Sequence, residues 1–305
     1  MTDLPAHSPL SHVLLPARGV LTIAGADRQA FLQGLVSNDV AKATEARAIH
    51  AAFLTAQGRF LHEFFLVAHG ESLLMDCEAA RREDLKKRLS LYRLRSKVTL
   101  TDTAADWTVA ALFGDGAAAA FGLAPEAGGA VQVDGGVVFV DPRLPALGLR
   151  AILPPTTAEA TLAARGFAPA PFEAYDRMRL ALGVPDGSRD LPVEKAILLE
   201  SGFDELNGVD WQKGCYMGQE LTARTKYRGL VRKRLMPVAI DGPTPAPGTP
   251  LTIDGQDAGE MRSGIEGIGL ALVRLEALQA ATDAGKTIVA GESRLTPSRP
   301  GWAQF

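Results

Sequence analysis

Residues 213–220 read KGCYMGQE, and this stretch decides how the chain is interpreted. It places Cys215, one of two cysteines in the chain, two residues after Lys213 and shortly before residues 219–224, which are predicted to form a short helix. A thiol near the positive end of a helix dipole, with an ammonium close by, is expected to ionise more readily than a free cysteine. Cys215 is therefore a candidate for chemistry rather than for packing.

Three neighbours of Cys215 are candidates for supporting roles. On the functional interpretation, Lys213 lowers the pKa of the thiol while Glu220 and Arg224 hold the loop in place. The competing interpretation is structural, because Glu220 and Arg224 are four residues apart and can pair on one helix face. Such a pair contributes only about 0.2–0.5 kcal/mol. The second cysteine, Cys77, closes an apolar strand pattern and is interpreted as structural.

The composition is typical of a globular protein. At 305 residues the chain is long enough for two or three domains, and no apolar run reaches the length that spans a bilayer. Two distant cysteines do not make a disulfide framework, and the first twenty residues resemble neither a secretory signal nor an Arg-rich transit peptide. We therefore expect the bacterial cytoplasm. Without CxxC or HxxxH pairs, the sequence predicts no local metal site.

A basic segment surrounds the motif. Residues 213–234 hold seven Lys or Arg side chains against one acidic residue, so the segment carries a formal charge of +6 and the rest of the chain about −9. The segment is either a solvated basic face or an anion site for a folate glutamate tail, a phosphate or an acidic partner. Direct nucleic-acid binding is not expected, because aromatic residues are sparse there.

The periodicity predicts an α+β fold. Strands are predicted at 20–23, 49–54, 60–68, 72–77, 98–101, 109–113, 131–133, 137–140 and 151–153, and helices at 27–35, 78–92, 157–164 and 172–182. After Arg234 the sequence pattern changes: short strands are predicted at 235–240, 249–253, 258–262 and 269–275, separated by turns rich in Gly and Pro. This C-terminal part is predicted to be a small β-barrel.

The central motif also resembles that of a known family. KGCYMGQE followed by Arg224 is similar to the signature of the YgfZ group, folate-binding proteins related to the T-protein (aminomethyltransferase) of the glycine cleavage system. The longer run from Arg189 to Leu235 looks closest to the branch that contains the mitochondrial iron–sulfur assembly factor. A second, weaker match covers Gly25–Val40 and Ala56–Leu66.

The resemblance implies a two-part architecture and a set of ligand contacts. Residues 1–234 would form a T-protein-like, multi-lobed folate-binding region around a central cavity, and 235–305 the C-terminal β-barrel. Tetrahydrofolate would be the cofactor. Its predicted contacts are Glu63, Tyr175, Asn38 and Gln219.

Each of three predicted folate contacts has a competing structural interpretation. Glu63 is a lone carboxylate on an apolar strand face and is exposed, partnered or functional. Tyr175 is either a pterin-stacking residue or a core tyrosine. Asn38, with Asp39, either lines the cavity or forms a turn.

The chain also departs from the T-protein pattern at two positions. The T-protein has an aspartate where this chain has Cys215, and a pterin-binding glutamate where this chain has Ala181. Glycine-cleavage activity is therefore in doubt, and whether the protein is an enzyme stays open.

The resemblance favours a tetrahydrofolate-binding accessory factor for the assembly or repair of [4Fe–4S] proteins, including radical-SAM enzymes that modify tRNA. Its partners would be iron–sulfur enzymes and assembly proteins, with no membrane contact, and the protein would be a monomer. One alternative is a folate-dependent aminomethyl transferase. The other is a non-catalytic interaction module that docks through the basic segment.

Overall fold

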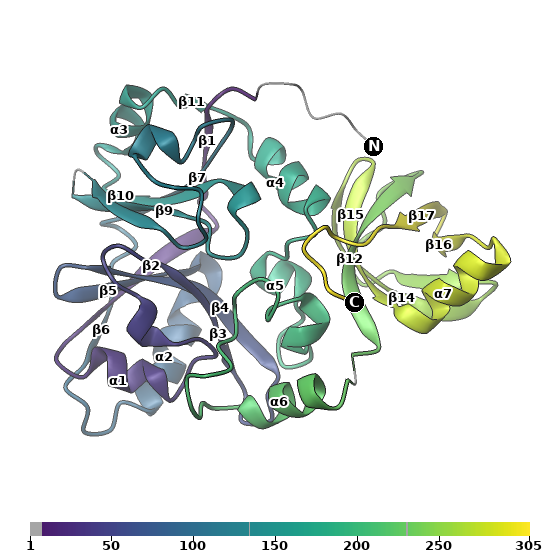
Figure 1. Ribbon diagram of the computed structural model, residues 1–305, viewed down its shortest axis with the longest axis horizontal. Helices are drawn as coiled ribbons and strands as arrows, with labels where there is room; N and C mark the ends of the chain where they lie inside the picture. The colour runs from purple at the N-terminus through teal and green to yellow at the C-terminus, as the bar shows by residue number, and fades with distance from the viewer. Residues whose placement is uncertain (1–7, 134, 230) are drawn as a thin grey trace. The chain divides into compact units, whose positions relative to one another are not determined.

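The computed structural model describes residues 8–133, 135–229 and 231–305 (Figure 1). The chain forms two compact units, each built from segments that lie far apart in the sequence. Unit 1 comprises the chain up to Phe53 together with His62–Tyr175 and Asn207–Tyr216. Unit 2 comprises Leu54–Leu61, Asp176–Leu206 and Met217–Phe305. The predicted division into residues 1–234 and 235–305 stays a prediction.

Unit 1 contains two mainly antiparallel sheets. The five-stranded sheet has the order β3-β4-β5-β2-β6, with β2 Arg18–Ala24, β3 Ile49–Leu54, β4 Phe60–His69, β5 Ser72–Glu78 and β6 Thr99–Asp102. The six-stranded sheet has the order β11-β1-β7-β10-β9-β8, with β1 Ser11–Leu14, β7 Thr108–Phe113, β8 Ala130–Val133, β9 Gly136–Val140, β10 Leu149–Leu153 and β11 Ala168–Pro169. The short β11 pairs in parallel with β1.

Strand β4 has both faces buried, which explains its nearly continuous apolar sequence. On one face His62 contacts Asp84 of helix α2 (Arg82–Leu91), with 2.9 Å between Nε2 and the carboxylate. Burial and the nearby Arg81 lower the pKa of His62 to about 4, so its ring is neutral at pH 7. Glu63 and Phe65 lie on the other face, toward the second sheet.

Unit 2 is centred on a closed barrel of order β12-β15-β14-β13-β16-β17. Its strands are β12 Lys233–Asp241, β13 Pro250–Ile253, β14 Gln256–Ile265, β15 Ile268–Arg274, β16 Ile288–Ala290 and β17 Ser293–Pro297. A cluster of buried apolar side chains, including Val238, Leu251 and Val273, fills its interior. Closure pairs both sides of every strand, so the predicted barrel is confirmed.

The remaining α-helices are short. They are α1 Arg28–Gln33, α3 Ala158–Ala164, α4 Phe172–Ala181, α5 Gly187–Asp190, α6 Gln219–Tyr227 and α7 Leu275–Ala284. Single 3₁₀ turns lie at η1 Val40–Lys42, η2 Ala79–Arg81, η3 Ala119–Phe121, η4 Pro145–Leu147 and η5 Leu198–Ser201.

The α+β class is confirmed, and most predicted elements differ from the observed ones by one or two residues at each end. The predicted helix at 78–92 begins as the 3₁₀ turn η2. Helix α6 extends three residues further than predicted, to Tyr227. Helices α5 and α7 and strands β1, β11, β16 and β17 were not predicted. None of the helices in the described ranges has the length and apolar character needed to cross a membrane.

Candidate functional site

Lys213 anchors the motif loop to the backbone of unit 1. Its ammonium donates to the carbonyls of Gln33 (2.7 Å), Val36 (2.5 Å) and Asn38 (2.8 Å). Gln33 is the last residue of helix α1, and the other two lie in the turn that follows it. An ammonium has three N–H donors, so these bonds use all of them. Burial lowers the pKa of Lys213 to about 8, which leaves the side chain charged at neutral pH. The ammonium therefore has no donor left for the Cys215 thiolate, and its first role is to anchor the loop.

Further bonds fix the segment that leads to the motif. Ser37 Oγ donates to the Gly208 carbonyl at 2.5 Å, and the Asn38 amide donates to the Asn207 carbonyl at 2.8 Å. Lys42 forms an ion pair with Asp210 at 2.5 Å. The loop before Cys215 is thus attached at several points to the turn after α1, and it is held in one conformation.

Cys215 is exposed, whereas Cys77 is buried in the five-stranded sheet. The Cys77 thiol contacts the Gly19 carbonyl at 3.6 Å, and burial raises its pKa to about 12. Cys77 therefore lies in the structural environment that its strand pattern predicts. Of the two thiols, that of Cys215 is the accessible one.

We expect native Cys215 to react with iodoacetamide at least about a hundredfold faster than Cys77. Burial keeps the reagent away from the Cys77 sulfur and also lowers the fraction of Cys77 that is present as the reactive thiolate. The rates are measured by quenching the reaction over time and quantifying the two modified peptides by mass spectrometry. Unfolding in guanidinium should bring the two rates together. Equal rates in the native protein would contradict the exposed-thiol assignment.

Gly218, the last glycine of the motif, immediately precedes α6 and has a backbone conformation that suits glycine. Its φ is +81°, and a Cβ there would lie 2.5 Å from the Thr55 carbonyl oxygen and 2.9 Å from the Leu54 Cβ. Gly58, in the β3–β4 turn, has the complementary constraint, because its Cβ would lie 2.6 Å from the Gly218 oxygen. Two glycines thus permit a backbone contact within unit 2 that no side chain would allow.

The three candidates on α6 lie at its N-terminal end or along its exposed face. Gln219 is the first residue of the helix, and Glu220 and Arg224 are both exposed. Glu220 and Arg224 form no ion pair with each other or with any other described residue, so the predicted i,i+4 pair is not observed. Their roles, like that of Gln219, stay predictions.

Glu63 is the carboxylate at the centre of a buried charge network in unit 1. It accepts hydrogen bonds from Arg18 at 2.6 Å and from His50 Nε2 at 2.9 Å. Burial raises its pKa, but the positive charge of Arg18 and the bond from His50 outweigh burial and hold the pKa well below its ordinary value. Glu63 is therefore ionised and paired with neighbouring side chains. Its position on an apolar strand face had left three interpretations (exposed, partnered or functional), and the structure shows the partnered one.

The network continues through two further carboxylates and two further arginines. Arg18 also bonds Asp76 at 2.7 Å, and Arg150 bonds the other oxygen of Asp76 at 3.0 Å. Arg143 makes a two-point contact with Asp141, at 3.0 and 2.7 Å. With Glu63, the network contains three buried cations and three buried anions, so its charges balance.

Phe65 is the platform on which the arginines pack. The guanidinium carbons of Arg18, Arg143 and Arg150 lie 5.5, 5.0 and 4.1 Å from the centre of its ring. The His50 ring stacks on Phe65 at 5.2 Å. These arginines were not predicted from the sequence, although each lies within or next to an apolar strand, where a charged residue signals a partner.

Asn38 and Tyr175 are also committed to protein partners. The Asn38 amide donates to the carbonyls of His50 and Asn207, and its side-chain oxygen accepts from the Asp39 backbone N–H. The Tyr175 hydroxyl accepts from Arg143 at 3.3 Å, and its ring is packed beside Phe113 and Phe172. Asp39 caps the 3₁₀ turn η1, so the turn interpretation holds for it.

These contacts bear on how folate would fit. The polar atoms of Glu63 and Asn38 already bond protein atoms, and the Tyr175 ring is buried. As placed, these three side chains do not offer folate free contacts. Ala181, at the position of the T-protein glutamate, ends α4 and has no polar side-chain atom. Within the described part of the chain, no group of three or more His, Cys, Asp or Glu side chains is arranged to hold a metal ion.

Comparison with solved structures defines the class of protein. The chain is similar to glycine cleavage system aminomethyltransferase T from Bartonella henselae, with a TM-score of 0.74 over 97% of this chain and 87% of that one, at 15% identity. A family model described as the CAF17 C-terminal β-barrel domain matches residues 232–305. The protein thus has an aminomethyltransferase-like fold that ends in a CAF17-type barrel.

Curated relatives define the family more narrowly. The human mitochondrial iron–sulfur cluster assembly factor IBA57 is 36% identical, over 87% of this chain and 78% of that protein. The homologue from Pyricularia oryzae is 33% identical, over 92% and 75%. The chain therefore belongs to the IBA57-like iron–sulfur cluster assembly factors of the YgfZ/CAF17 family.

The expected bacterial cytoplasmic location is contradicted by these relatives. The human, mouse and fungal proteins are all named as mitochondrial, which points to the mitochondrion rather than the cytoplasm. The expectation was wrong because it relied on the two distant cysteines and on the composition of the first residues, which are weak signals beside a relative that matches most of the chain.

Proposed function

We propose that this protein supports the assembly or repair of [4Fe–4S] proteins, including radical-SAM enzymes that modify tRNA, through the thiol of Cys215. Membership of the assembly-factor family supports the iron–sulfur role. The partners on this proposal are iron–sulfur enzymes and components of the assembly machinery.

The observation that carries the proposal is the exposed Cys215 at the end of an anchored loop. The anchor consists of the three bonds from Lys213 to backbone carbonyls and the bonds from Ser37 and Asn38. A thiol meant only for packing would be buried, as Cys77 is. An exposed thiol on a rigid support is suited to meet the iron or sulfur of a client, because little conformational freedom is lost when contact is made.

We also propose tetrahydrofolate as a ligand, on the strength of the aminomethyltransferase-like fold. Since Glu63, Asn38 and Tyr175 bond protein groups, we assign no step of the mechanism to folate. Calorimetry of the reduced protein with tetrahydrofolate tests this part on its own. Saturable binding would support it, and no heat of binding would remove folate from the proposal without affecting the role of Cys215.

The decisive experiment is rescue of a strain that lacks this gene, with the activity of a [4Fe–4S] radical-SAM enzyme as the readout. We expect wild type to rescue and Cys215→Ser to lose at least about tenfold in client activity, because a hydroxyl is a poor substitute for a thiolate toward iron or sulfur. Cys77→Ala is the matched control, since it removes the other thiol, and it should rescue.

Protein abundance and circular dichroism establish that each variant is folded. Full rescue by folded Cys215→Ser would remove the thiol from the mechanism. Failure of wild type itself to rescue would refute the iron–sulfur role.

A further inference from the structure

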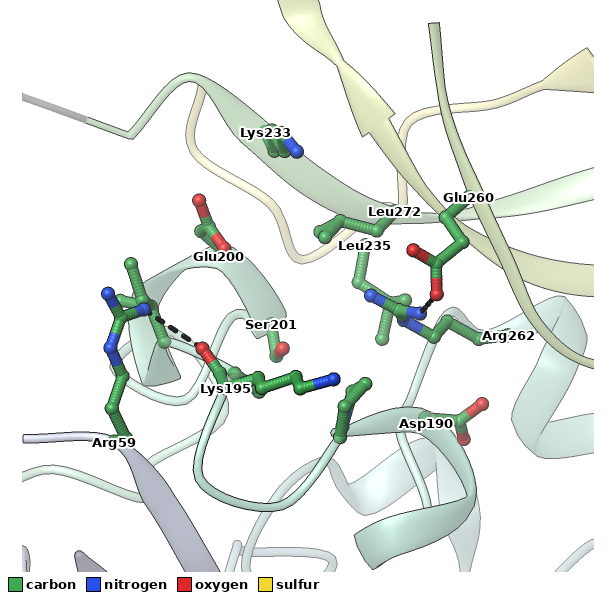
Figure 2. A pocket seen from close by; sticks show the side chains of 13 residues that line it. Arg59, Asp190, Lys195, Glu200, Ser201, Lys233, Leu235, Glu260, Arg262 and Leu272 are labelled. Atoms are coloured by element: carbon green, nitrogen blue, oxygen red, sulfur yellow. Dashed lines mark hydrogen bonds and ion pairs between the residues drawn. The ribbon is translucent and has the colours of Figure 1, made fainter. Parts of the chain in front are cut away.

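Unit 2 contains a charged pocket that lies outside the motif loop and outside the network around Glu63. Figure 2 shows the side chains that line it. The volume of the pocket is about 360 Å³. Its walls come from the β3–β4 turn, the segment around η5 and the barrel strands β12, β14 and β15. The cationic side chains that line it are Arg59, Lys195, Lys233 and Arg262, and the acidic ones are Asp190, Glu200 and Glu260.

The four cations come from separate segments and meet around one space. Arg59 is oriented by a 2.9 Å bond to the Lys195 carbonyl, and Lys195 and Arg262 extend into the pocket from different walls (Figure 2). Arg262 forms an ion pair with Glu260. The ammonium groups of Lys195 and Lys233 form no ion pair with any residue in the described ranges.

The charges of the pocket do not balance internally. Asp190 is already neutralised from outside the pocket, because it accepts from Arg179 at 2.7 Å and from Ser263 at 2.5 Å. The four cations then face only Glu200 and Glu260, which leaves about two positive charges uncompensated. Glu200 is the internal carboxylate among them, and burial raises its pKa while Lys233, Arg59 and Arg262 oppose that rise.

The walls are fixed in advance of any ligand. Phe60 and the segment after Pro192 exchange backbone bonds, from Phe60 N–H to the Ala196 carbonyl at 3.0 Å and from Glu194 N–H to the Phe60 carbonyl at 2.7 Å. On the opposite wall, the Ser263 N–H donates to Asp190 at 3.0 Å. Because the backbone of the walls is already bonded, less conformational freedom is lost there when an anion binds.

We propose that this pocket binds a phosphate group, either free or as a small monoester. A dianion balances the two excess positive charges, and the forked guanidinium donors of Arg59 and Arg262 suit phosphate oxygens. Leu235 and Leu272 supply apolar lining for the body of an ester. This site is independent of Cys215 and of the proposed function in iron–sulfur assembly.

The test is calorimetry of the full chain with inorganic phosphate and with phenyl phosphate. Lys233→Gln should weaken binding about tenfold, because it removes one unit of the excess charge. Glu200→Gln should tighten binding about threefold to tenfold, because it removes the competing internal carboxylate without changing the size of the side chain. Arg294→Gln, an exposed charge on β17 that does not line the pocket, is the matched control and should bind like wild type.

The opposite signs for Lys233→Gln and Glu200→Gln separate a phosphate site from a loss of folding, which would weaken binding in both variants. Tighter binding of phenyl phosphate than of phosphate identifies a monoester as the ligand, and equal binding identifies free phosphate. No saturable binding at millimolar concentrations would overturn the proposal. So would an equal loss in Arg294→Gln, or weaker binding in Glu200→Gln.

Discussion

Arg18→Met is expected to lower the free energy of unfolding by about 3–5 kcal/mol, the usual cost of removing one partner of a buried ion pair while the other charge stays buried. The Arg18 side chain is 5% exposed and bonds both Glu63 and Asp76. Methionine fills a similar volume but leaves two buried carboxylates with less positive charge beside them. Urea denaturation followed by circular dichroism measures the change.

A double-mutant cycle tests the electrostatic cause of this loss. Adding Glu63→Gln should recover part of the stability that Arg18→Met loses, because the neutral amide no longer needs a cation. Arg81→Met is the control, since Arg81 and Glu78 form a looser pair at 3.6 Å nearer the surface and should contribute about 1 kcal/mol or less. Strictly additive losses in the double variant would show that packing, rather than charge, sets the cost.

The same network makes a pH-dependent contribution to stability. Because the folded-state pKa of Glu63 lies well below that of an unfolded glutamate, its ionised form stabilises the folded protein above that unfolded pKa. The contribution is lost as pH falls through the folded-state pKa. Arg18→Met raises the folded-state pKa toward the unfolded one, so its stability should fall less than that of wild type as pH falls below the ordinary glutamate pKa of 4.5.

Gly218→Ala is expected to cost about 3 kcal/mol, which combines the strain of a positive φ with a clash against backbone. The new Cβ would lie 2.5 Å from the Thr55 oxygen, so either the start of α6 or the β3–β4 turn must move. Thermal and urea unfolding measure the loss.

Gly214→Ala is the matched control because it lies in the same motif, also at positive φ (+89°), but its Cβ would meet nothing within 4 Å. It should cost only the backbone strain, about 1 kcal/mol. Equal losses for the two variants would show that the contact with the β3–β4 turn contributes nothing.

The sequence predicted local structure well where a single segment carries the signal. Alternation placed Glu63 on one strand face, and the apolar pattern identified β4 and β5 within a residue or two. Helix α7 was not predicted, although it carries a similar local signal in Leu275, Leu278 and Ala281, at helical spacing.

The charge network and the glycine contact could not be predicted in the same way, because each joins distant segments. Arg18 lies 45 residues from Glu63, and Arg150 lies 74 residues from Asp76. Periodicity indicates which face a side chain occupies, but it does not indicate which other strand faces it. The bonds by which Lys213 anchors the loop could not be predicted for the same reason, since its partners Gln33 and Val36 are 180 and 177 residues away.

The closed barrel of unit 2 also limits how other molecules can recognise it. Each of its six strands has a neighbour on both sides, so no row of unpaired backbone N–H and C=O groups is available for an incoming chain to extend the sheet. A client or assembly protein that contacts the barrel must therefore recognise its side chains and loops. Selectivity there can change by single substitutions while the backbone of the barrel stays the same.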